Sequence, residues 1–101
     1  MYVENKAKSL DGPGRIGWVE TTRTNRTFIY QGRRLQKTKS GYKYNCFDVE
    51  TLENYWVSGP KKNGQDKLYG GVVEIDEDAR EEYWLKIRNE PSKIECSRYR
   101  S

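Results

Sequence analysis

The chain has 101 residues, of which 34% are hydrophobic, 34% charged and 13% aromatic, and its formal net charge is +4. This length fits one domain and leaves no room for two independent cores. With so few apolar residues, the core must depend on aromatic side chains, each of which buries a large area. No apolar run approaches the roughly 18 residues of a membrane span or the about 7–15 of a signal peptide, so we expect a soluble, cytoplasmic protein.

The charge is unevenly distributed along the chain. Residues 1–45 carry ten Lys or Arg against three acidic residues, a balance of +7, whereas residues 46–101 carry nine against twelve, a balance of −3. A basic half favours a polyanion or an acidic partner. The alternative is that these Lys and Arg side chains only keep a small aromatic-rich domain soluble, and the sequence leaves both interpretations open.

A single β-rich domain is predicted over residues 15–90. Residues 1–14 are polar and end in Asp-Gly-Pro-Gly, which predicts a loose N-terminal arm. Alternating apolar side chains predict about five short strands in the domain. These strands cover residues 15–22, 27–38, 42–49, 54–59 and 71–75. Within the second, Gln31-Gly32 forms either a tight hairpin turn or a glycine bulge.

One helix is predicted over about 76–88, because Asp76 is a favoured N-cap and acidic residues follow it in the first turn. Four apolar side chains fall on one face at helical spacing, which favours core packing over a cofactor site. They are Ala79, Tyr83, Trp84 and Ile87. Pro91 ends the helix, and residues 91–101 form a polar tail that either adds a short edge strand or stays mobile.

The fold class that follows is mainly β with one C-terminal helix. Short antiparallel strands joined by tight turns favour a small bent sheet or an SH3-like, partly open barrel, with the helix closing one end or face. We expect one core between sheet and helix. Its predicted members are Trp18, Tyr44, Phe47, Trp56, Val73, Tyr83, Trp84 and Ile87.

Three segments carry a resemblance to other proteins. They are YKYNCFDVET at residues 42–51, YWVSGPKK at 55–62 and EIDEDAREEYW at 74–84. In this region, which spans about half the chain, the sequence resembles a group of short uncharacterised bacterial proteins with a tyrosine-rich hairpin and a terminal acidic helix. The resemblance implies no function.

Most catalytic chemistry is excluded by composition. The chain has no histidine, which removes the commonest general base and every Ser-His or Cys-His arrangement. Its two cysteines, Cys46 and Cys96, are too few for a zinc site, and we expect both to be reduced, Cys46 in the core and Cys96 solvated. P-loop and dinucleotide-binding glycine motifs are missing. We therefore expect a protein that is not an enzyme and uses no cofactor or metal.

Nucleic-acid binding is the first functional hypothesis, because single strands are held by aromatic platforms within a basic groove. The candidate site residues are Arg23, Arg26, Arg33, Arg34, Tyr42, Lys43, Tyr44, Tyr55, Lys61, Lys62, Lys67 and Tyr69. Gly59-Pro60 ends a strand and Asn63-Gly64 turns the chain, which predicts an exposed tip carrying the three lysines. The tyrosines also fit a purely structural role in strand pairing.

A protein-protein interaction module is the second hypothesis. It would act as an adaptor, an inhibitor or a homodimer partner, through exposed aromatic side chains or an edge strand. The salt dependence of the binding affinity separates the two hypotheses. Neutralising phosphates releases counterions, so affinity for nucleic acid falls steeply as salt rises, whereas the affinity of an aromatic-centred protein interface changes less.

Overall fold

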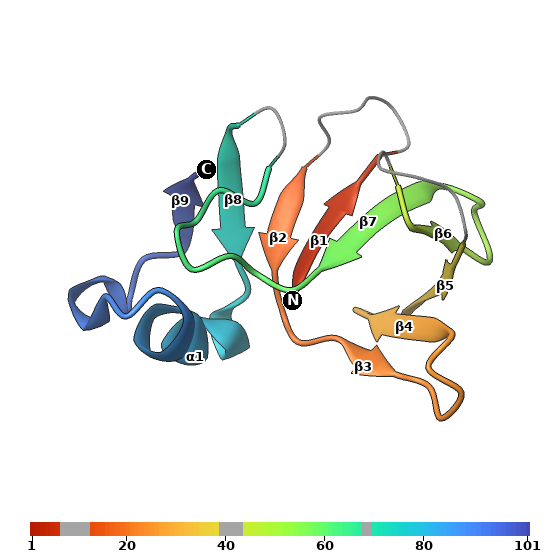
Figure 1. Cartoon of the computed structure of the whole chain (residues 1–101), viewed down its shortest axis with the longest axis horizontal. Helices are drawn as coiled ribbons and strands as arrows, with labels where there is room; N and C mark the ends of the chain where they lie inside the picture. Colours follow the sequence, from red (N-terminus) through yellow and green to blue (C-terminus); the bar gives the residue numbers. More distant parts are fainter. Residues whose placement is uncertain (7–12, 39–43, 68–69) are drawn as a thin grey trace.

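The computed structural model describes residues 1–6, 13–38, 44–67 and 70–101. These residues form a curled open sheet of nine strands, a half-barrel, with one helix near the C-terminus (Figure 1). The strands are β1 Tyr2–Asn5, β2 Gly14–Ile16, β3 Glu20–Thr21, β4 Thr27–Tyr30, β5 Arg33–Lys37, β6 Cys46–Asp48, β7 Asn54–Ser58, β8 Val72–Ile75 and β9 Arg98–Arg100. The structure confirms the predicted class, mainly β with one C-terminal helix, and the predicted bent, open sheet.

The strand order across the sheet is β3-β4-β5-β6-β7-β1-β2-β8-β9. All neighbouring pairs are antiparallel except β2 with β8. The predicted number of about five strands is wrong. One reason is that Gln31 and Gly32 form a tight turn with φ of 49° and 76°, the left-handed pair that matches strand twist in a hairpin, so one predicted strand is two. The SH3-like description stays a prediction.

The predicted loose arm is wrong, because β1 lies in the middle of the sheet. It pairs antiparallel with β7 on one side and with β2 on the other. Tyr2, Val3 and Glu4 are all buried, at 0%, 3% and 1% exposure. Glu4 is the residue that makes this strand look solvated in sequence, yet its carboxylate is held by the Tyr2 hydroxyl and the Lys6 ammonium.

The C-terminal residues also belong to the sheet. Strand β9 pairs with β8 at the edge, so the edge-strand alternative for residues 91–101 is the one the structure adopts. Tyr99 in this strand is 8% exposed and lies among the buried residues that pack under the helix. Residues on both sides of 15–90 therefore contribute to the same sheet.

The helix runs over residues 77–87, as a 3₁₀ turn at Glu77–Ala79, the short α-helix α1 at Arg80–Glu82 and a π-helical turn at Tyr83–Ile87. A 3₁₀ turn at Pro91–Lys93 follows it. Asp76 occupies the N-cap position as predicted, but its side chain makes no capping hydrogen bond. Its carboxylate instead accepts hydrogen bonds from Arg15 Nε at 2.8 Å and the Tyr30 hydroxyl at 2.6 Å, and so connects the helix start to two strands.

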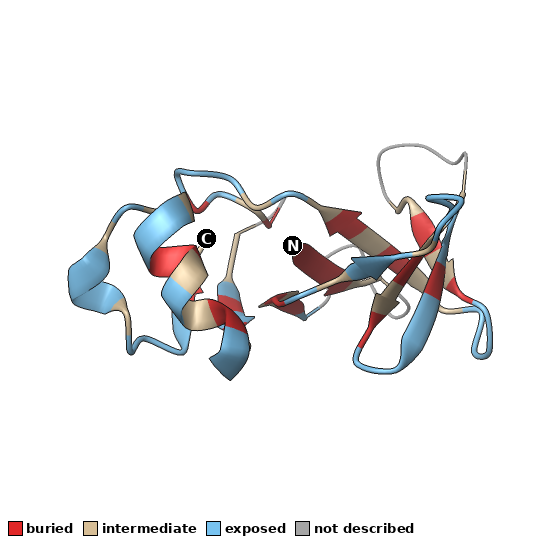
Figure 2. Ribbon diagram, turned by 90° about the horizontal axis from the view of Figure 1, so that it is seen from below, coloured by how far each residue is buried: buried red, intermediate tan, exposed pale blue. Residues whose placement is uncertain are grey.

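Two hydrophobic cores lie on opposite faces of the sheet, where a single core was predicted. Figure 2 shows buried segments both beside the helix and in the half-barrel. The helix core contains Tyr2, Ile16, Val73, Ile75, Ala79, Tyr83, Trp84 and Tyr99. The inner core, enclosed by the curl of the sheet, contains Val3, Phe28, Tyr30, Leu35, Cys46, Tyr55 and Val57. Because successive side chains in a strand point to opposite faces, one curled sheet supplies both cores.

The predicted core residues divide accordingly. Val73, Tyr83 and Trp84 are buried in the helix core, and Trp56 and Ile87 pack against its margin. Tyr44 and Phe47 are half-buried, and Trp18 is 54% exposed. The prediction that Trp18 lies in the core is wrong. The strand that begins at Gly14 ends at Ile16, so the chain no longer places alternate side chains on one face at Trp18.

Two tryptophans provide a matched test of this core. Trp84 is 1% exposed and packs edge-on against Tyr83, so Trp84→Ala should lower the free energy of unfolding by about 3–5 kcal/mol. Trp18→Ala should lower it by under about 1.5 kcal/mol, the net worth of the hydrogen bond from its indole to the Asp78 carbonyl. Chemical denaturation followed by circular dichroism measures both. Equal losses would contradict the assignment of the helix core.

Candidate nucleic-acid interface

The predicted site residues do not gather on one face. Tyr42, Lys43 and Tyr69 lie outside the described residues. Tyr55 is 6% exposed and belongs to the inner core, and Tyr44 is half-buried. The exposed members are Arg23, Arg26, Arg33, Arg34, Lys61 and Lys62.

The predicted exposed tip does not include Lys67, because this residue is only 8% exposed. Its backbone N–H donates to the Ser101 hydroxyl at 2.9 Å. Gly71 and Ser101 exchange two backbone hydrogen bonds, of 2.6 and 3.3 Å, so Lys67 and Gly71 are both held to Ser101. Only Lys61 and Lys62 occupy the predicted tip, around a turn in which the Gly64 N–H donates to the Lys61 carbonyl.

The strands at one end of the sheet carry a concentrated positive charge. Residues 20–37 contain five basic side chains and one acidic side chain. Arg23, Arg26 and Arg34 are exposed and form no ion pair with any described residue. We call these three residues the basic edge. Because no carboxylate neutralises them, their charge is available to a polyanion.

An acidic segment lies at the opposite end of the molecule, which also carries the exposed basic residues Lys86, Arg98 and Arg100. Residues 74–82, which lead into and form most of the helix, contain six acidic side chains and one arginine. The helix and the β3–β5 strands lie at opposite ends of the sheet in both ribbon views (Figures 1 and 2). The acidic segment 74–82 and the basic edge are therefore separated in space, which favours approach of a polyanion at the basic edge.

Two aromatic side chains lie on the outer face of the sheet near the basic edge. Phe47 on β6 pairs with Asn54 on β7, so Trp56, two residues further along β7, is its diagonal neighbour on the same face. Gln36 on β5 lies directly opposite Phe47, and Arg34 follows on that face. We call Arg34, Gln36, Phe47 and Trp56 the outer aromatic face.

Both rings of the outer aromatic face are half-buried. Trp56 packs against the margin of the helix core, and its indole N–H donates to the Ser58 hydroxyl at 3.0 Å. Sequence reasoning assigned Phe47 and Trp56 to the core and chose the tyrosines as ligands instead. The alternation of Tyr55 and Trp56 shows that they face opposite ways, but only the curl of the sheet decides which of them is enclosed.

A cavity of about 200 Å³ opens beside Trp56. Its lining comprises Glu4, Lys6, Trp56, Ser58, Gly59, Lys61 and Asp66. Lys6 Nζ lies 2.6 Å from a Glu4 carboxylate oxygen. Asp66 accepts hydrogen bonds from the Lys61 backbone N–H at 2.7 Å and the Tyr99 hydroxyl at 2.5 Å, so the wall of the cavity is fixed to the folded sheet.

A second hollow, of about 110 Å³, lies on the inner face between Arg15, Tyr30, Arg33 and Tyr55. Each arginine there is paired: Arg15 lies 2.6 Å from Asp76 and Arg33 lies 2.9 Å from Asp48. Burial, and then the hydrogen bond to Asp76, raises the pKa of Tyr30, so its hydroxyl remains a donor. With its arginines compensated, this hollow is a weaker site for a polyanion than the outer face.

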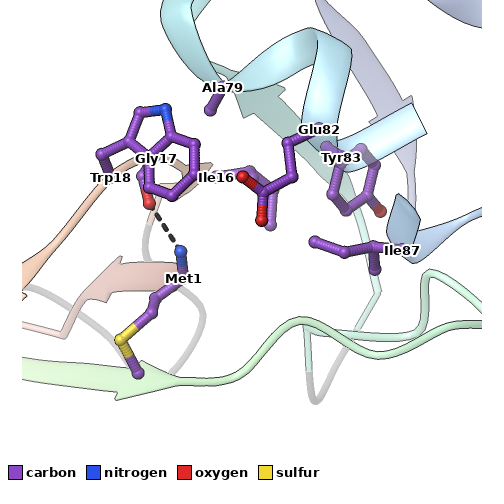
Figure 3. A pocket seen from close by; sticks show the side chains of 8 residues that line it. All are labelled: Met1, Ile16, Gly17, Trp18, Ala79, Glu82, Tyr83 and Ile87. Carbon is purple, nitrogen blue, oxygen red and sulfur yellow. Dashed lines mark hydrogen bonds between the residues drawn. The ribbon is translucent and has the colours of Figure 1, made fainter. Parts of the chain in front are cut away.

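The hollow between Trp18 and the helix is too small for a ligand (Figure 3). Its volume is about 30 Å³, room for little more than a water molecule. Beside it the Met1 ammonium donates to the Gly17 carbonyl at 2.5 Å, and the Glu82 carboxylate extends toward the same space (Figure 3).

The cysteines have the predicted environments. Cys46 is fully buried in the inner core, and burial raises the pKa of its thiol to about 11, which keeps it unreactive near neutral pH. Cys96 is exposed, and both are free thiols. Within the described ranges no group of three or more His, Cys, Asp or Glu side chains is placed to hold a metal ion. None of the helices in this part of the chain is long and apolar enough to cross a membrane.

No protein-family model, curated protein or solved structure matches this chain. The resemblance to short bacterial proteins therefore stays a prediction, and the functional inference depends on the geometry alone.

Asp48 fixes the turn between β6 and β7. Its carboxylate accepts from the Glu50 N–H at 2.8 Å, the Thr51 N–H at 3.3 Å and Arg33 at 2.9 Å. Burial by itself would raise the pKa of Asp48, but these hydrogen bonds outweigh it and hold the pKa below its ordinary value.

This shift predicts a pH dependence of stability. A carboxyl whose pKa is lower in the folded state stabilises the fold above its unfolded pKa of about 3.9, and that stabilisation is lost as the pH falls through the folded pKa. We expect the free energy of unfolding to fall below about pH 5 more steeply in wild type than in Asp48→Asn. Urea denaturation at several pH values measures this, with Glu50→Gln, an exposed carboxylate of the same turn, as control. Parallel curves for wild type and Asp48→Asn would contradict it.

Proposed function

We propose that this chain is a non-enzymatic binding module for single-stranded nucleic acid, and that the strand crosses the outer aromatic face. The observation that supports this is the pair Phe47 and Trp56, half-exposed diagonal neighbours beside an unpaired arginine. Proteins hold single strands by stacking bases on aromatic side chains while basic residues neutralise the phosphates.

The outer face carries both aromatic rings and basic side chains, placed one after another on adjacent strands. Exposed aromatic residues on neighbouring strands of a sheet are the arrangement with which sheet-based RNA-binding domains stack two or three bases. Here Arg34 lies on β5, Phe47 on β6 and Trp56 on β7, in adjacent strands of the sheet. Lys61 lines the cavity on the far side of Trp56. A strand running from the basic edge toward Lys61 therefore passes over both rings.

Single strands should bind more tightly than duplexes, because stacking on a side chain requires a base face that a duplex has already buried. In this proposal the exposed arginines, Lys61 and Lys62 keep the binding role predicted from sequence. Tyr55 and Lys67 serve the fold instead. Tyr42, Lys43 and Tyr69 remain predicted contacts.

A protein partner is the second candidate, favoured by Trp18. Its ring is 54% exposed although its indole N–H is already bonded to the Asp78 carbonyl. A large aromatic side chain held in place at the surface is a common anchor in protein interfaces. An adaptor, an inhibitor or a homodimer would use the surface around Trp18, beside the start of the helix.

Phe47 gives the direct test of the first proposal. Loss of one stacking ring costs about 1–3 kcal/mol per base, so Phe47→Ala should weaken binding of a single-stranded oligonucleotide roughly 5- to 150-fold. Fluorescence anisotropy at about 50 mM salt measures the affinity. Trp18→Ala removes an aromatic ring that lies beside the helix start and outside the outer aromatic face, and it should leave the affinity unchanged. Equal effects of the two substitutions would contradict the assigned surface.

The basic edge gives an independent test. Each phosphate contact on a single strand contributes about 0.7 to the slope of log affinity against log salt. The triple variant Arg23→Ala, Arg26→Ala, Arg34→Ala should therefore bind more weakly and with a slope flatter by about 2.

A triple variant at the other end, Lys86→Ala, Arg98→Ala, Arg100→Ala, changes the net charge equally through exposed residues and serves as control. If both triple variants lose affinity alike, binding follows net charge and no defined edge exists. A wild-type protein that binds no oligonucleotide at about 50 mM salt would overturn the proposed function.

A further inference from the structure

We propose that the base stacked on Phe47 is preferentially adenine, because the amides of Gln36 and Asn54 bind its two polar edges. This inference rests on the proposed function and adds a base preference to it. The three residues lie on adjacent strands, Gln36 on β5, Phe47 on β6 and Asn54 on β7. We call Gln36, Phe47 and Asn54 the amide row.

The register of the sheet sets the spacing of the amide row. Gln36 is directly opposite Phe47, and Phe47 is directly opposite Asn54. Opposite residues of antiparallel strands have their side chains on the same face and their Cβ atoms about 4.5–5.5 Å apart. The two amide side chains therefore start roughly 10 Å apart, one on each side of the Phe47 ring. A base stacked on that ring has an amide beside each of two edges.

Both amides of the row are available to a ligand. Gln36 is exposed and Asn54 is half-buried, and neither side chain makes a hydrogen bond to any residue that the structure describes. Buried side-chain nitrogen and oxygen atoms in this part of the chain all have a partner, so the unbonded Asn54 amide is open to solvent. Asn54 contributes to the fold through its backbone carbonyl, which accepts from the Lys6 N–H at 2.8 Å.

Adenine is the base that matches an amide on each of two edges. An amide side chain presents a carbonyl acceptor next to an NH₂ donor. Adenine offers the complementary pair twice, because its N6 amino group lies between N1 and N7 and has one hydrogen on the side of each. Asn and Gln bind the N6 and N7 pair through two hydrogen bonds in other nucleic-acid complexes. The amide row can therefore hold adenine from both sides.

The other bases satisfy only one of the two amides in this way. Guanine presents two acceptors, O6 and N7, on its second edge, so an amide oxygen there would face another acceptor. Cytosine, thymine and uracil have a carbon atom, C5, beside their exocyclic group, and this atom leaves one group of the amide unpaired. A polar group left without its partner in the complex costs binding energy.

The ring of Trp56 has different neighbours. Continuing the register places Asn45 beside it, but the Asn45 amide already bonds the Val57 N–H at 2.9 Å and the Val57 carbonyl at 2.7 Å. Glu4, opposite Trp56 on β1, is 1% exposed and its carboxylate is already paired. The fold uses both of these polar groups, so a base on Trp56 is stacked without selection and the preference arises at Phe47.

The test uses octamers of thymidine in which one central position is adenine, guanine or cytosine, together with oligothymidine. A paired contact to a base edge discriminates roughly 5- to 150-fold. A site of about four nucleotides meets an octamer in about five registers, and one of them places the central base on Phe47. The adenine octamer should therefore bind wild type roughly 2- to 30-fold more tightly than the other three. Anisotropy titrations at about 50 mM salt measure all four affinities.

A double variant removes both amides and leaves the ring. Gln36→Met keeps a side chain of similar length without hydrogen-bonding groups, and Asn54→Ala keeps the backbone carbonyl. In this double variant the four affinities should become equal while binding to oligothymidine persists. Thr27→Val is the matched control, because Thr27 lies opposite Gln36 on the side away from Phe47, and this variant should keep the preference. Melting temperatures show that each variant is folded.

The outcomes separate the two proposals. If folded wild type binds all four octamers equally, or prefers guanine or cytosine, the adenine preference is overturned and single-strand binding stands. If the preference survives the double variant, or is lost equally in Thr27→Val, the amide row does not select the base and this inference is overturned. If no octamer binds, the proposed function fails and this inference fails with it.

Discussion

The pairing of β1 with both β7 and β2 is the interaction on which the rest of the structure depends. It joins the half-barrel strands β3–β7 to the helix-bearing strands β2, β8 and β9. Tyr2 packs in the helix core and Val3 packs in the inner core, so adjacent residues of one short strand bridge the two cores. Without this strand the sheet would divide into β3–β7 on one side and β2, β8 and β9 on the other, and each core would lose one of its buried side chains.

A second link crosses from the helix to the half-barrel. The Asp76 carboxylate at the helix start binds Arg15 of β2 and the Tyr30 hydroxyl of β4. Gly17 permits this approach, because a Cβ there would lie 2.3 Å from an Asp76 carboxylate oxygen and 2.6 Å from the Tyr30 ring. The polar contacts and the glycine together hold the helix start against β2 and β4, the strands that carry Arg15 and Tyr30.

Local patterns predicted local structure well and the arrangement of faces poorly. The hairpin turn at Gln31-Gly32, the helix start after Asp76 and the buried stripe including Trp84 all follow from short-range rules of backbone geometry and periodicity. Strand β1 was missed because Glu4 looks solvated unless its partners Tyr2 and Lys6 are known. The choice between Tyr55 and Trp56 as the exposed ring depends on long-range curvature, which alternation alone does not encode.

In the proposed function, the two rings of the outer aromatic face differ in how they would couple folding to binding. Trp56 packs against the helix core and lines the cavity beside it, so its loss would affect stability and binding together. Phe47 belongs to neither core, and its ring lies between the basic edge and Trp56. The contribution to binding proposed for Phe47 is therefore separable from the stability of the fold. A binding surface built on a rigid sheet in this way keeps its geometry without a ligand, which reduces the entropy lost when a flexible strand is ordered upon it.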